Sequence, residues 1–186
     1  MFSKFKLRIG HSKLRKQLKG FKRSKMVYNL VSARRVGVLL SITSEEVFNL
    51  AIELVNFLSK RNLDVCLLAH FPGKEIPQQF LLRKNVNVFN AKEVNWYGKP
   101  IAPIVQEFVD IDFDILIDLS MQEFFPIRWI ASVSKAKFKA GFLLYYGSPS
   151  DLIINVKQDE ELGYAIEQLK HYLQLINNRF EQDSNQ

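Results

Sequence analysis

The chain has 186 residues, of which 47% are hydrophobic and 24% are charged. This length and composition suit one soluble globular domain and exclude wholesale disorder. The single cysteine, Cys66, excludes an intramolecular disulfide and a cysteine-based zinc cluster, which fits a reducing cytosol. Because the sequence has no apolar stretch of about 18 residues and no apolar signal core, we expect neither a membrane span nor a secretory signal.

The formal net charge of +7 is unevenly distributed along the chain. Residues 1–35 carry twelve Lys and Arg and no Asp or Glu, and we call this segment the basic arm. Residues 36–186 hold fourteen basic against nineteen acidic residues, a net charge of −5. Such an asymmetry indicates a segment that binds a polyanion, either nucleic acid or an anionic membrane.

The basic arm has the pattern of a short amphipathic helix. Ser12 is placed to cap a helix start, and Leu14, Leu18 and Phe21 then recur on one helical face. Gly20 weakens such a helix by about 1 kcal/mol relative to alanine. The cations that we expect to contact the polyanion are Lys13, Arg15, Lys16, Lys19, Lys22, Arg23 and Lys25.

Apolar runs and helical periodicities alternate from Val36 onward. Residues 36–42 are a continuous apolar run, typical of a strand buried on both faces. Thr43 and Glu46 form a predicted capping box for a helix that reaches about Lys60. We then expect, in chain order, strands at 64–69 and 86–89, a helix at 104–109, a strand at 113–119, a helix at 124–134, strands at 139–144 and 152–156, and a helix at 162–176.

This alternation predicts a single α/β domain of three layers, Rossmann-like, with a mostly parallel sheet. We expect the basic arm at 1–35, the domain at 36–180 and a frayed polar tail at 181–186. Because the strand and helix pattern is complete within the domain, we expect residues 36–180 to fold without the basic arm.

Ligands of open α/β sheets bind beyond the carboxyl ends of the strands, so the residues at those ends are the candidates. The loop after the first strand has no glycine, and the chain has neither a Walker pattern nor GxGxxG, which argues against a phosphate loop. Other strand ends carry His70, Asp118 and Ser120, and we take these as a candidate ligand site. Asp114 has the spacing to share a side with Asp118, and Tyr145 and Tyr146 have the placement to line a groove.

No catalytic or metal site stands out among these residues. The three histidines are scattered without ligand spacing, and Cys66 lies inside a strand, where it reads as a core residue. We therefore expect no catalytic residue, no metal and no cofactor.

Residues 113–142 resemble a stretch of lipopolysaccharide heptosyltransferases and related GT-B glycosyltransferases. The matching positions are Asp114, Asp118, Lys137 and Gly141. The resemblance implies a fold like that family's N-terminal Rossmann half. The family's first loop carries a Gly-Asp pair with a catalytic Asp, whereas this chain has Thr43, Ser44, Glu45 and Glu46 there with altered spacing, and the chain ends before a second, donor-binding domain. The whole chain also resembles a family of small uncharacterised bacterial proteins, a domain of unknown function.

These features lead us to expect a non-catalytic, cytoplasmic α/β domain whose basic arm binds RNA. Ribosomal RNA is one candidate. The alternative is a degenerate glycosyltransferase-like domain that binds a sugar or a nucleotide. An anionic membrane ranks below RNA as a partner, because the basic arm has no tryptophan and only a short apolar face. A protein partner remains open.

Overall fold

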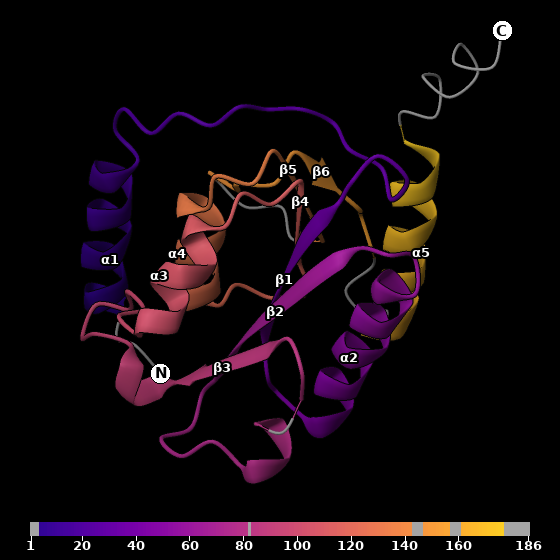
Figure 1. The fold of residues 1–186 in the computed structure, drawn as a ribbon. Coiled ribbons are helices and arrows are strands. Elements are labelled where there is room, and N and C mark those ends of the chain that lie inside the picture. The colour runs from indigo at the N-terminus through magenta and orange to yellow at the C-terminus, as the bar shows by residue number, and fades with distance from the viewer. Residues whose placement is uncertain (1–3, 82, 143–146, 157–160, 177–186) are drawn as a thin grey trace, which may run out of the picture.

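A computed structural model describes residues 4–81, 83–142, 147–156 and 161–176 (Figure 1). The tail at 181–186 and the tyrosines at 145 and 146 lie outside the described residues. The helices are α1 (Lys4–Gln17), α2 (Glu45–Ser59), α3 (Pro103–Asp110), α4 (Phe125–Val133) and α5 (Leu162–Leu175), with short 3-10 turns at Gln78–Phe80 and Ala91–Glu93. The strands are β1 (Arg35–Ser41), β2 (Asp64–Phe71), β3 (Val86–Asn90), β4 (Ile115–Asp118), β5 (Phe138–Gly141) and β6 (Leu152–Ile153).

These six strands form one parallel sheet in the order β3-β2-β1-β4-β5-β6. Unbroken apolar runs such as Val36–Leu40 suit a sheet that is covered on both faces. The strand order reverses between β1 and β4, which is the topological switch point of a Rossmann-type sheet. The predicted α/β, three-layer architecture is confirmed.

Helices cover both faces of the sheet (Figure 1). On one face, α2 and α5 pack over residues such as Val38, Leu67 and Ile117 to form the larger apolar core. On the other face, α3 and α4 pack over Leu39 and Leu116. The carboxyl ends of the strands therefore lie at one edge of a rigid, doubly covered sheet.

Helix α1 adds an outer layer on the side of α3 and α4 (Figure 1). Leu14 of α1 is 3% exposed and packs with Phe125, Trp129 and Val133 of α4. Gly10 makes the close approach possible, because a Cβ atom there would lie 2.4 Å from the Tyr97 carbonyl oxygen and 2.7 Å from the Phe125 ring. The first half of the basic arm is thus a docked helix.

After α1 the chain crosses over the amino ends of the strands to reach β1 (Figure 1). The Arg23 guanidinium donates to the carbonyl oxygens of Ala136 and Lys137, both at 3.0 Å, and to both carboxylate oxygens of Asp151. Farther on, the Leu30 N–H donates to the Leu173 carbonyl oxygen of α5. These bonds tie the crossing segment to the sheet edge.

Two predicted helix starts are wrong. The first helix begins at Lys4, not at Ser12, because Leu7, Gly10 and Leu14 form the face that packs on the body. The cap of α2 is Ser44, not Thr43: the Ser44 Oγ accepts from the Val47 N–H at 3.2 Å. Thr43 and Glu46 therefore do not form the capping box that their spacing indicates.

Among the described residues, no helix combines the length and apolar character needed to cross a membrane.

Candidate functional site

The predicted ligand residues lie along the carboxyl edge of the sheet, but only one of them lines a cavity described there. His70 ends β2 beside Ser41 of β1, whereas Asp118 ends β4 on the other side of β1. Neighbouring strands lie about 4.8 Å apart, so roughly 10 Å separates the two strand ends. His70 lines a cavity at this edge, and Asp118 and Ser120 are not among its lining residues.

Asp118 and Ser120 form a local turn. The Ser120 N–H donates to Asp118 Oδ1 at 3.0 Å, and burial raises the pKa of the Asp118 carboxyl. Ser120 is 6% exposed. The arrangement stabilises the loop that follows β4.

Asp114 and Asp118, which the sequence places on one side of the strand, stand at opposite ends of β4. Asp114 lies at the amino end of β4 and accepts hydrogen bonds from the backbone N–H groups of Arg34 and Arg35 and from Lys137 Nζ at 2.8 Å. Partial burial alone raises the pKa of Asp114, but these donors lower it overall. Asp114 thus anchors the end of the basic arm to the sheet, about 13 Å along the strand from Asp118.

His70 is a buried, neutral histidine. It is 8% exposed, and its Nδ1 lies 3.3 Å from the Ser41 hydroxyl. Burial lowers the pKa of His70 to about 4, so the ring carries no charge at pH 7. One ring nitrogen therefore donates and the other accepts a hydrogen bond.

The cavity beside His70, which we call the crevice, has a volume of about 740 Å³. Its walls come from the N-terminal half of α1, the ends of β2 and β3, and the loop from β4 into α4. Apolar groups include Leu7, Val94 and Phe124, and polar groups include His11, His70 and Gln122. This volume and mixed lining are typical of small-molecule sites.

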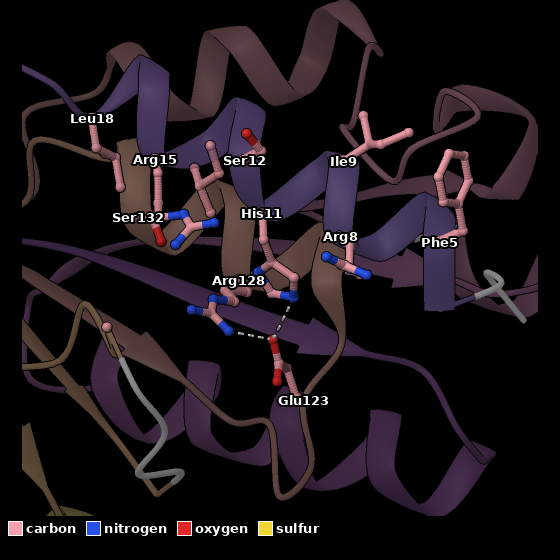
Figure 2. A pocket seen from close by; sticks show the side chains of 12 residues that line it. Phe5, Arg8, Ile9, His11, Ser12, Arg15, Leu18, Glu123, Arg128 and Ser132 are labelled. Atoms are coloured by element: carbon pink, nitrogen blue, oxygen red, sulfur yellow. Dashed lines mark hydrogen bonds and ion pairs between the residues drawn. The ribbon is translucent and has the colours of Figure 1, made fainter.

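A second cavity, of about 860 Å³, lies between α1 and α4 (Figure 2). Arg8 and Arg15 enter it from α1, and Arg128 enters it from α4. Glu123 lies among them, 2.5 Å from Arg128 and 3.9 Å from His11. Burial, reinforced by Arg128, lowers the pKa of His11. The lining is therefore strongly cationic around one carboxylate.

This second cavity continues into a third, of about 550 Å³, and the two share Leu18, Ser132 and Gly147. The third cavity is lined by the cations Lys22, Arg23, Lys25 and Lys139. We call the two together the basic groove. Its position, between α1 and the body, follows from the docking of Leu14 on α4.

The cations that the sequence marks for polyanion binding have different surroundings. Lys13, Arg15, Lys16, Lys19 and Lys22 are exposed and form no ion pair within the described structure. Arg23 is instead bound to Asp151, which Lys25 also approaches at 3.2 Å. Arg23 and Lys25 therefore bind the chain's own Asp151, whereas the five cations without an ion pair in the described structure are available to a partner.

Sequence reasoning missed Lys139, which is buried at 3% exposure. Its Nζ donates to the Ala131 carbonyl oxygen at 2.6 Å, one of the last carbonyls of α4. Burial, reinforced by the positive charge of Arg23, lowers the pKa of Lys139 to about 7. The signal for a buried amine is the position of Lys139 inside a short, largely apolar strand.

Sequence reasoning also missed His11, Glu123 and Arg128, which meet between the two cavities. The spacing of Leu7, His11, Leu14 and Leu18 places His11 on the docked face of α1 and was a readable signal. Glu123 and Arg128 carry no such signal, because only the docking of α1 brings them to His11.

The parallel sheet, its strand order and the cavities at its carboxyl edge define an α/β protein of the Rossmann-like class. The chain belongs to DUF6913, a family of unknown function, whose model matches residues 6–176. That match begins within α1 and covers most of this helix together with the body. No curated protein matches the chain.

Proposed function

We propose that this protein binds RNA through the basic groove and the exposed cations of α1 and the segment that follows it. The observation that carries the proposal is that Lys13, Arg15 and Lys16 are exposed, form no ion pair within the described structure and are held on a helix that is itself docked on the body. A fixed row of cations meets phosphates with less loss of conformational entropy than a flexible tail does. Phosphate contacts of this kind position a strand without reading its bases.

Two features favour RNA over a membrane surface. Leu7 and Leu14 of α1, and Leu18 just after it, pack against the body, so this apolar stripe is not available to a bilayer. Phe5 is 71% exposed and lines the groove at the N-terminal end of α1, where an aromatic ring can stack with a base (Figure 2).

The proposal also names the kind of organism, the cell compartment and the RNA. We propose a bacterial, cytoplasmic protein with ribosomal RNA as the first polyanion to test. The single, half-buried Cys66, whose thiol pKa is raised by burial, supports a reducing compartment. We propose no catalytic role.

The test is the salt dependence of RNA affinity. With about four to eight phosphate contacts, the log–log slope of the association constant against salt should lie between about −3 and −7. Replacing Lys13, Arg15, Lys16 and Lys19 with glutamine should flatten this slope by about three units, measured by fluorescence anisotropy on a single-stranded RNA.

The matched control removes the same charge from the body, at the exposed residues Lys60, Lys74, Lys84 and Lys92. This control should leave the slope within about one unit of the wild-type value. Equal flattening by both variants would mean that net charge alone drives the binding, and absence of salt-dependent binding to any RNA would refute the proposal. Binding of the wild type to anionic vesicles instead would assign the groove to a membrane.

A further inference from the structure

The crevice and the basic groove are neighbouring spaces on the same side of the sheet. His11 and Glu123 line both of them. Helix α1 is their common wall, with Arg8 and Arg15 in the groove and Leu7 in the crevice. A ligand long enough to follow the groove can therefore place one of its groups in the crevice.

The crevice differs from the groove in its chemistry. Its charged side chains, Lys6 and Glu123, carry opposite charges, and burial lowers the pKa of both imidazoles, that of His70 to about 4. Leu7, Val94 and Phe124 supply apolar and aromatic surface. These groups suit a flat, uncharged ring better than a phosphate.

His70 supplies the directional contact. Its Nδ1 lies 3.3 Å from the Ser41 hydroxyl, and the ring lines the crevice although the residue as a whole is only 8% exposed. A ligand in the crevice that supplies a hydrogen-bond donor or acceptor can therefore pair with this ring. A nucleobase presents both kinds of group along its edges.

We propose that the crevice receives one unstacked nucleobase of the RNA strand whose phosphates lie in the basic groove. The inference rests on the proposed function and deepens it. The base packs between Leu7 and Phe124 and forms a hydrogen bond with His70, while Arg8, Arg15 and Arg128 face the backbone on the other side of His11. Single-stranded RNA is the partner because only an unpaired base can leave its stack.

The first experiment tests the crevice without RNA. Adenosine, guanosine, cytidine and uridine are titrated separately into the full chain while the His70 imidazole is followed by nitrogen-15 NMR. At least one nucleoside should shift the His70 ring signals in a saturable way. In Ala91→Trp, which fills the crevice from its wall, the same nucleoside should leave them unshifted.

The second experiment compares a single-stranded RNA hexamer with its fully abasic counterpart. The wild type should bind the intact hexamer about 5- to 100-fold more tightly. Ala91→Trp should lose most of this difference and keep the salt slope of the wild type, because the groove is untouched. His70→Gln, which adds no bulk, should lose a part of this difference in affinity between the intact and the abasic hexamer.

Ile101→Trp is the matched control, because Ile101 is exposed at 58% and does not line the crevice. It should behave as the wild type. Equal affinity of the wild type for intact and abasic RNA overturns the inference. If nucleosides still shift His70, the crevice takes free nucleosides and not an RNA base. If the protein binds RNA in a salt-dependent way but shows neither the nucleoside shift of His70 nor the preference for intact RNA, this inference fails and the proposed function stands. If nucleosides bind but RNA does not, the proposed function fails.

Discussion

His70 shows how burial sets the chemistry of one residue. The ring lies on the sheet beside Phe89, with 5.0 Å between the ring centres, and Ser41 is its hydrogen-bonding neighbour. Burial lowers its pKa to about 4, below the ordinary value of 6.5. The folded protein therefore resists protonation of His70, whereas the unfolded chain does not.

This difference predicts a loss of stability in mild acid. Because the folded pKa is depressed, the contribution of neutral His70 is complete above about pH 6.5 and is lost as the pH falls toward 4. We expect the free energy of unfolding to fall by about 2 kcal/mol between pH 7.5 and pH 5 on this account. Urea unfolding at several pH values measures this fall in the free energy of unfolding.

The control is His70→Gln, which keeps a polar side chain and has no titration in this range. Its unfolding free energy should change less with pH than that of the wild type over the same interval, and the difference between the two curves isolates His70. Parallel curves would show that His70 is protonated as easily in the folded state as in the unfolded state.

At the scale of elements, the close packing of α1 on the body depends on Gly10. A methyl group at that position meets backbone and aromatic ring at less than 3 Å, namely the Tyr97 carbonyl oxygen and the Phe125 ring. Helix propensity acts in the opposite direction, since alanine favours an isolated helix over glycine by about 1 kcal/mol. The sign of the substitution effect therefore reports whether the helix is docked.

We predict that Gly10→Ala destabilises the protein by about 1–3 kcal/mol, because the overpacked helix must shift away from Tyr97. Thermal and urea unfolding measure the change. Ser12→Ala is the matched control on the exposed side of the same helix, and it should change stability by less than about 0.5 kcal/mol. An increase in stability for Gly10→Ala would mean that α1 is solvated on all sides.

At the scale of the whole molecule, helix α1 contributes no residue to the sheet or to the two described apolar cores that cover its faces. The residues of the larger core begin at Leu30, and all the described strands begin at Arg35 or later. What α1 adds is a small third cluster, in which Leu14 meets Phe125, Trp129 and Val133. The molecule is thus a complete α/β unit with one helix packed on its surface.

A variant that starts at Met26 should therefore still unfold in one cooperative transition. Removing residues 1–25 uncovers Trp129 and loses the burial of Leu14, which contributes about 1.5–3 kcal/mol. It also removes the bonds of Arg23 to Ala136, Lys137 and Asp151. We expect the melting temperature to fall by about 5–10 °C, measured by calorimetry. A broad, non-cooperative transition would show that α1 belongs to the core of the fold.

Local patterns in the sequence were sufficient for the elements and the architecture. Most strands lie within mainly apolar runs, and the helices have apolar residues every three or four positions. Both signals lie within short segments of the sequence. The parallel sheet followed from their alternation. Helix boundaries were less certain: Ser44, not Thr43, caps α2, because neighbouring hydroxyls compete for one position.

The candidate site was decided by tertiary structure. Asp114 and Asp118 are four residues apart, yet one anchors the basic arm at the amino edge and the other ends β4 at the carboxyl edge. His11 reaches Glu123 and Arg128 only because α1 docks on α4, more than a hundred residues later in the chain. The sequence by itself determined the strands, the helices and the positive charge of the basic arm, since these depend on neighbouring residues. Only the tertiary structure decided which cations face a groove and which, like Arg23, are bound to the chain itself, because that depends on contacts between distant segments.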